Sequence, residues 1–142
     1  MSKSNRQPIF VYSPDVVQTA LATTANTARD GTGTITQIYQ AAGNVHGSLA
    51  EVIKFIATGA TTLGLINLFR KQGGTGNWMF VAQVEVAAVT PSATVKAWEG
   101  YVAGNEMPLR LSNGDTLGAA PTKGSEQFNA LVEAGPLQNS DS

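Results

Sequence analysis

Two apolar runs separated by a short polar connection constrain this chain more than any other feature. The runs are Leu49–Ala57 and Leu63–Phe69, and Thr58-Gly59-Ala60-Thr61-Thr62 connects them. Each run has the length of a strand, is rich in Ile, Leu, Phe or Val, and is bounded by Gly or small polar residues, which is typical of buried β-strands. The sequence therefore predicts two buried strands joined by a turn, as a hairpin at the centre of the fold.

Both runs are apolar on two faces. The predicted inward face of the first run consists of Leu49, Glu51, Ile53, Phe55 and Ala57. The opposite face carries Val52 and Ile56, and Leu65 and Phe69 share one face of the second run. A strand with one face open to water normally alternates apolar and polar residues. We therefore expect the second face to be covered either by another layer of the same domain or by a sister subunit, which makes these four residues candidate subunit contacts.

Six further segments have strand-like patterns, and turn signals separate the strands roughly every 10–15 residues. The segments are Val16–Thr24, Thr34–Ala41, Trp78–Val86, Thr94–Ala103, Thr116–Ala120 and Glu126–Ala134. A helix remains an alternative for the first and the last. The clearest alternation places Trp78, Phe80, Ala82, Val84 and Val86 on one face. This rhythm predicts an all-β chain, an antiparallel β-sandwich or jelly roll of about eight strands.

The two ends of the chain differ from the middle. Residues 1–15 are expected to form an extended N-terminal arm, because Pro8 and Pro14 each remove a backbone donor. Four adjacent large apolar residues of this arm favour burial, either on their own domain or on a neighbour, and are further candidate contacts: Ile9, Phe10, Val11 and Tyr12. The β-sandwich domain is predicted to span residues 16–135, and residues 136–142 form a polar tail.

Charge composition excludes several classes of partner. Charged residues make up 13% of the chain, about half the usual share, which fits either surfaces that meet other protein or an ordinary low-charge sandwich. The nine basic residues are scattered, so we expect no nucleic-acid partner. No run approaches the roughly 20 apolar residues that span a bilayer, and the short N-terminal apolar run is no signal peptide. We therefore expect synthesis in the cytoplasm and no membrane partner.

The sequence predicts no catalytic site, metal or cofactor. His46 is the only histidine and there is no cysteine, so the usual zinc ligand sets are missing. The segment Gly73-Gly74-Thr75-Gly76 lacks the Lys-Ser/Thr ending of a phosphate loop. Glu85 and Glu99 lie on neighbouring candidate strands, but such pairs are common on solvated sheet faces. The chain is therefore predicted not to be an enzyme.

Three aromatic residues support a different class of function. Trp78, Trp98 and Tyr101 would suit a sugar-stacking platform if they were exposed together. Packing in the core or between subunits is the interpretation that we favour for these three residues. A carbohydrate-binding or host-attachment module of a tail or fibre is thus one alternative function.

Four short motifs resemble a family of virion structural proteins of tailed bacteriophages. They are ThrAlaAsnThrAlaArgAspGlyThrGlyThr at 24–34, AlaThrGlyAlaThrThrLeuGlyLeuIleAsnLeuPhe at 57–69, ThrProSerAlaThr at 90–94 and AsnGlyAspThrLeu at 113–117. Their order and spacing cover most of residues 20–135. The arm and the tail lie outside the resemblance.

The resemblance implies a non-enzymatic cement or decoration protein with a β-sandwich or jelly-roll fold. Such proteins bind the major capsid protein on the outside of the capsid, often as homotrimers, so the expected location is the virion exterior. The candidate contacts named above would then face a sister subunit or the capsid. A head-tail connector or minor tail component is a further alternative.

Overall fold

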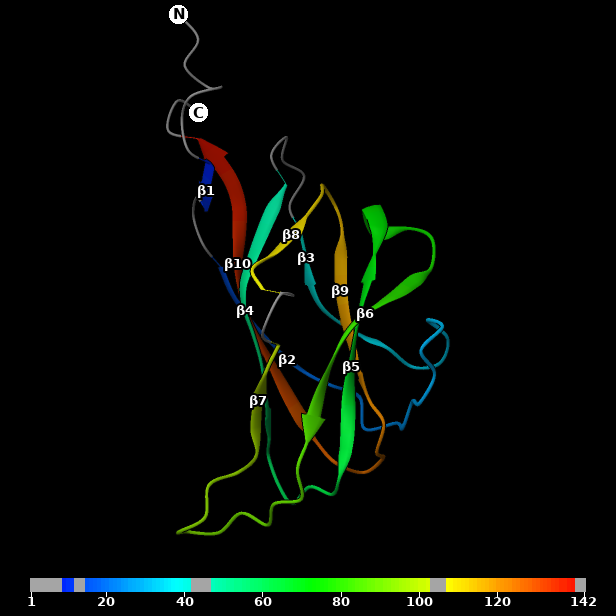
Figure 1. The fold of residues 1–142 in the computed structure, drawn as a ribbon, viewed down its shortest axis with the longest axis vertical. Helices are drawn as coiled ribbons and strands as arrows, with labels where there is room; N and C mark the ends of the chain where they lie inside the picture. The colour runs from blue at the N-terminus through cyan, green and yellow to red at the C-terminus, as the bar shows by residue number, and fades with distance from the viewer. Residues whose placement is uncertain (1–8, 12–14, 42–46, 103–106, 140–142) are drawn as a thin grey trace, which may run out of the picture.

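Two antiparallel sheets pack face to face in the computed structural model, which describes residues 9–11, 15–41, 47–102 and 107–139 (Figure 1). The described part of the chain contains ten strands and one short 3-10 helix, η1. In chain order they are β1 Ile9–Val11, β2 Asp15–Ala20, β3 Thr36–Gln40, β4 Ser48–Ala57, β5 Gly64–Lys71, η1 Gln72–Gly74, β6 Trp78–Val86, β7 Glu99–Tyr101, β8 Leu109–Leu111, β9 Thr116–Pro121 and β10 Phe128–Asn139.

The first sheet is organised around β10 and β4, which pair along almost their whole length. β1 and β2 follow one another along the other edge of β10, and β7 and β8 follow one another along the other edge of β4. The second sheet has the order β3-β9-β5-β6. This all-β, antiparallel sandwich confirms the predicted fold class.

The two central runs do not form a hairpin. β4 pairs with β10, β7 and β8 in the first sheet, whereas β5 pairs with β6 and β9 in the second. Thr58–Thr62 is therefore a crossing between the two sheets. Alternation and turn residues cannot distinguish a hairpin from such a crossing, because both need two strands and a short polar connection.

A bulge in β4 changes which residues face the core. Its register with β10 shifts so that Val52 pairs with Glu133 and Ala50 with Ala134, which leaves Glu51 without a partner. The extra residue reverses the alternation. Ala50 is consequently buried in the place predicted for Leu49, while Ile53, Phe55 and Ala57 face inward as predicted.

A second bulge divides the predicted face of β6. Leu68 pairs with Ala82 and Phe69 with Phe80, so Val81 has no partner. Val84 and Val86 are buried in the core as expected, but Phe80 lies on the outer side and its ring contacts Phe69. The prediction that Phe80 shares the inward face is therefore wrong.

The core lies between the two sheets and consists of aliphatic and aromatic side chains from both. Its largest fully buried members are Phe55, Phe128, Ile38, Ile53, Ile66, Leu68, Leu111, Leu117 and Val132. The predicted inward set of the last strand, Phe128, Ala130, Val132 and Ala134, is buried throughout. The helical alternatives for the first and last segments are wrong, since both are strands.

The chain ends differ from the predicted arm and tail in the described residues. Within the arm, Ile9–Val11 form β1 and pair with Leu137–Asn139 of β10. β10 therefore continues to Asn139, beyond the predicted end of the domain at residue 135. Ile9 pairs with Asn139, which brings the two ends of the described chain together (Figure 1). Tyr12, His46 and residues 140–142 lie outside the described residues.

Candidate interaction surface

The outer face of the first sheet is the candidate functional site. Cross-strand register builds it from three rows of side chains that alternate with the buried positions. The rows are Val16, Glu133 and Val52; Gln18, Leu131, Lys54 and Tyr101; and Ala20, Asn129, Ile56 and Glu99. Along β4 and β10, the residues between these positions point into the core. The residues of the three rows therefore point outward, because side chains alternate along a strand.

Large apolar side chains are exposed on this face. Val16 is 65% exposed, Tyr101 is 51% exposed and Ile56 is 36% exposed. Leu131 and Val52 are half-buried. This face therefore differs from a purely polar, solvated sheet face.

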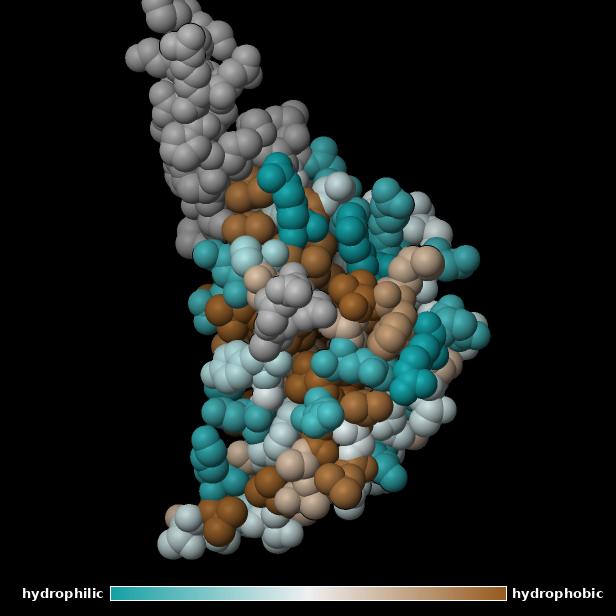
Figure 2. All heavy atoms as spheres, viewed as in Figure 1, coloured by the Kyte–Doolittle hydropathy of each residue, from teal (hydrophilic) through white to brown (hydrophobic). Residues whose placement is uncertain are grey.

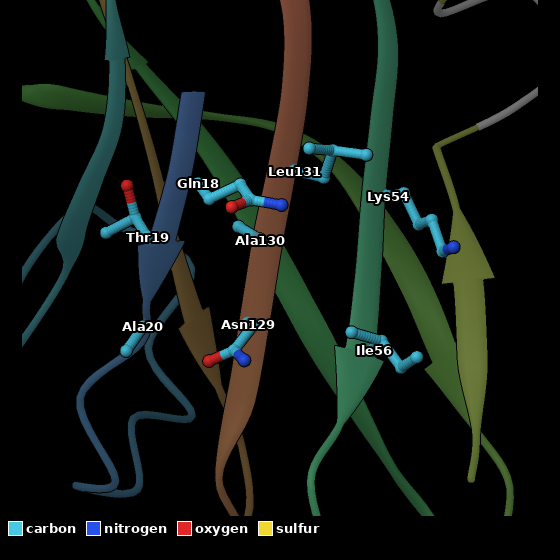
Figure 3. Close-up of a pocket in the computed structure, with 8 residues that line it drawn as sticks. All are labelled: Gln18, Thr19, Ala20, Lys54, Ile56, Asn129, Ala130 and Leu131. Carbon is cyan, nitrogen blue, oxygen red and sulfur yellow. The ribbon is translucent and has the colours of Figure 1, made fainter. Parts of the chain in front are cut away.

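A shallow groove of about 330 Å³ runs across the middle of the face. Gln18, Ala20, Lys54, Ile56, Asn129 and Leu131 are among its lining residues. Figure 3 shows Gln18 reaching from β2 across β10, while Lys54 and Ile56 reach from β4 toward β7. Ala20 and Asn129, which are cross-strand partners, both line this groove.

Two opposite charges of the face, Lys54 and Glu99, form an ion pair. The ammonium of Lys54 lies 3.3 Å from Glu99 and 5.8 Å from the centre of the Tyr101 ring. Lys96 lies 3.6 Å from the same carboxylate. The hydrogen bond from Lys54, together with the positive charges of Lys54 and Lys96, lowers the pKa of Glu99. Glu99 therefore stays ionised and holds Lys54 in place beside the groove.

The predicted contact residues divide between the two sheets. Val52 and Ile56 lie on the outer face of the first sheet, where Val52 is half-buried and Ile56 is exposed. Leu65 lies in the second sheet and is half-buried, with its backbone N–H donating to the Thr122 hydroxyl at 3.0 Å. For Ile9, Phe10 and Val11 the structure describes the backbone pairing of β1 alone.

Phe69 is fully buried by its own chain, so the prediction that it is a subunit contact is wrong. Its ring contacts that of Phe80 with centroids 5.9 Å apart. It pairs with Gly118, and a Cβ at Gly118 would lie 2.7 Å from Ile35 and 2.9 Å from the ring of Trp78. The connection between β2 and β3 thus covers the outer face of the second sheet.

A buried carboxylate connects three segments at one end of the second sheet, namely the end of β5, η1 and the turn before β9. Asp115 is fully buried and accepts hydrogen bonds from the backbone N–H groups of Gly73 at 2.8 Å and Ser112 at 2.9 Å. It also accepts from Arg70 Nε at 2.9 Å and from Arg70 Nη2. Burial raises the pKa of Asp115, but these four donors outweigh burial and the net shift is downward. We call this arrangement the Asp115 latch.

The three aromatic residues considered as a sugar platform do not come together. Trp98 is buried and packs edge-on against Phe128 with centroids 5.7 Å apart. Trp78 belongs to the second sheet, where Lys71 lies 4.4 Å from the centre of its ring. Tyr101 alone of the three is on the outer face of the first sheet. Glu85 and Glu99 also lie in different sheets.

Sequence reasoning missed several residues of the outer face, namely Val16, Gln18, Tyr101 and Leu131. Leu131 lies between the buried Ala130 and Val132, and Val16 and Gln18 flank the half-buried Val17. The β4 bulge and the pairing of β2 with β10 are needed to align these residues in rows. Among the described residues, no three His, Cys, Asp or Glu side chains are grouped to hold a metal ion. That part of the chain also has no helix of the length and apolar character needed to cross a membrane.

Comparisons with known proteins support the fold class. No protein-family model and no curated protein matches the chain. Among solved structures, Eiger TNF from S. frugiperda is similar, with a TM-score of 0.51 and 11% sequence identity over 94% of this chain and 97% of that one. At this identity the likeness concerns the fold alone, which in both chains is a jelly-roll β-sandwich.

The space-filling view shows the hydropathy of the side of the molecule that is turned toward the viewer. In Figure 2 apolar residues appear as small groups separated by polar ones, over the visible face of the molecule.

Proposed function

We propose that this chain is a non-enzymatic structural protein of a phage particle, which binds the outer surface of the capsid and stabilises the shell as a homotrimeric cement or decoration protein. The proposal starts from the four sequence motifs that resemble this family. The observation that carries it is the outer face of the first sheet, where Val16, Ile56 and Tyr101 are exposed and the described chain does not cover them.

The locations of the motifs agree with an architectural role. Asn26 in the first motif is buried, and its amide donates to the carbonyls of Thr32 at 2.9 Å and Thr34 at 3.0 Å. Thr61 in the second motif donates to the carbonyl of Ala87 at 2.6 Å. These residues stabilise loops, which leaves the regular sheet face available for partners.

The sandwich also suits a protein that must resist strain. Interactions between pre-ordered surfaces lose little conformational entropy on binding. The two sheets share one core, and β10 and β4 each pair with three other strands. A rigid body of this type is able to bridge neighbouring capsid subunits without first becoming ordered.

The test is assembly and capsid binding by the purified protein. Light scattering should give the mass of a trimer, and the protein should sediment with expanded, protein-free capsids. A monomer that remains in the supernatant would remove the basis of the proposal. A trimer that ignores capsids would retain the assembly and reject the capsid as its partner.

A further inference from the structure

The turn between β8 and β9 contains the one Asn-Gly pair of the sequence, Asn113-Gly114. The Asp115 N–H donates to the Ser112 carbonyl at 3.1 Å and closes the turn, and Gly114 has a φ of 76°. Positive φ at the third residue of a closed four-residue turn is the geometry that glycine favours. Asn113 is exposed, and the turn between β8 and β9 lies in the upper half of Figure 1.

We propose that Asn113 is a deamidation site and that the Asp115 latch controls its rate. The backbone nitrogen of Gly114 loses its proton and attacks Cγ of Asn113. A new N–Cγ bond closes a five-membered succinimide, the Cγ–Nδ2 bond breaks, and ammonia leaves with the proton. Water then opens the ring at either carbonyl, giving aspartate or isoaspartate. Gly114 has no Cβ, so nothing beside its nitrogen obstructs ring closure.

The latch limits this reaction because it fixes the backbone on which ring closure depends. Both the Ser112 N–H bond to the Asp115 carboxylate and the Asp115 N–H bond to the Ser112 carbonyl span the Asn113-Gly114 pair. Arg70 and Gly73 hold the same carboxylate from β5 and η1. The Gly114 nitrogen reaches Cγ when the turn opens, so the reaction rate follows the population of the opened turn.

The product acts back on the latch. Isoaspartate carries the main chain through Cβ and Cγ of residue 113 and lengthens the backbone between Ser112 and Asp115 by one carbon. The two Ser112–Asp115 hydrogen bonds require the shorter connection. The isoaspartyl form therefore loses these bonds and opens more readily than the parent chain, which makes the turn a slow, irreversible site of ageing at this end of the sandwich.

The tryptic fragment 111–123 makes the test specific. Arg110 and Lys123 are its cleavage sites, and Asn113 is its only amide side chain. Folded protein is incubated in mildly alkaline buffer at physiological temperature and sampled over weeks, with a sample digested at time zero to subtract loss during digestion. We expect the fragment to gain the mass difference between an amide and an acid, and isoaspartyl methyltransferase to label it. The Asn113→Gln variant should show neither change, because a longer side chain closes a less favourable ring.

Variants of the latch test the control of rate. Asp115→Ala should deamidate several-fold faster than the parent chain, and the milder Arg70→Gln should lie between the two. The denatured parent chain sets the upper limit and shows whether a variant has simply unfolded. Equal rates in the folded parent chain and in folded Arg70→Gln would overturn the control by the latch. Amide loss in the denatured chain with none in the folded chain would overturn the site itself.

Discussion

At the scale of single residues, the Asp115 latch is a buried hydrogen-bond network with one carboxylate at its centre. Its carboxylate is fully buried yet accepts four hydrogen bonds, from two backbone N–H groups and from Arg70. The buried charge is tolerated because these donors compensate it, since burying an unpaired charge raises the free energy of the folded chain. The latch joins η1, the end of β5 and the turn before β9.

Replacing Asp115 by Asn should lower the free energy of unfolding at neutral pH by about 1–3 kcal/mol, because an amide cannot accept from all these donors and leaves Arg70 without its partner. Arg70 is partly exposed, which limits the loss. Urea unfolding of the parent chain and the variant measures the difference. An Asn variant as stable as the parent would show that the four hydrogen bonds contribute little.

The same latch predicts a pH dependence. Because the pKa of Asp115 is lower in the folded chain than in the unfolded chain, its stabilisation is fully present above the ordinary aspartate pKa. It is lost as the pH falls through that value toward the lowered one. The difference in unfolding free energy between the parent and Asp115→Asn should therefore shrink on acidification below about pH 4. A difference that stays constant with pH would contradict ionisation as its source.

Two glycines provide a matched pair of substitutions. A Cβ at Gly118 would meet Ile35 at 2.7 Å and Trp78 at 2.9 Å, whereas a Cβ at Gly59 would meet nothing within 4 Å. Gly118→Ala should therefore lower the unfolding free energy by about 1–3 kcal/mol through overpacking, and Gly59→Ala should change it by less than about 1 kcal/mol. Thermal unfolding measures both. Equal effects would mean that Ile35 and Trp78 move aside at little cost in free energy.

At the scale of elements, β1 is the most separable strand. It pairs with β10 alone among the described strands, through three residue pairs beyond the part of β10 that β4 reaches. β2, by contrast, pairs with β10 over six residues that include the buried Val132. The N-terminal segment is therefore peripheral to the core in the described structure.

Deletion of residues 1–14 should leave the sandwich folded, since it removes β1 and no core strand. Under the proposed function the deletion should weaken binding to expanded capsids, because it removes the candidate contacts Ile9, Phe10, Val11 and Tyr12. Circular dichroism measures folding and co-sedimentation measures binding. Unchanged binding by the folded deletion variant would reject a role for this segment in capsid binding. Loss of folding would show that the pairing of β1 with β10 is needed for a stable sandwich.

At the scale of the whole molecule, the outer face of the first sheet is the assembly surface under the proposed function. Ile56→Lys places a charge in the groove of that face, next to Lys54. Leu63→Lys is the matched control, because Leu63 is 73% exposed but lies in the connection between β4 and β5. Both substitutions are at exposed positions and should preserve the fold.

We expect Ile56→Lys to abolish or strongly weaken trimer formation or capsid binding, and Leu63→Lys to leave both unchanged. Burying an unpaired charge in an interface is unfavourable by several kcal/mol, whereas a charge that stays in water costs little. Light scattering and co-sedimentation separate the two contacts. If neither responds to Ile56→Lys, the outer face is not the assembly surface.

Much of this molecule follows from the sequence alone. Short apolar runs between Gly- and Thr-rich connections determine an antiparallel β-sandwich, because each run buries one face by alternation. Alternation also identifies the inward residues of β10, and it places Ile56 on an outward face. These are local properties, which depend on the period of the strand and on the residues that end it.

The two runs at 49–57 and 63–69 show what only the tertiary structure decides. They belong to different sheets, and a single unpaired residue, Glu51, reverses the alternation within the first. The same pattern of two apolar faces also has two different causes. Phe69 is covered by its own chain through the β2–β3 connection, whereas Ile56 is exposed. Pairing, bulges and cover depend on residues distant in sequence, and the local pattern carries no information on which distant segment arrives.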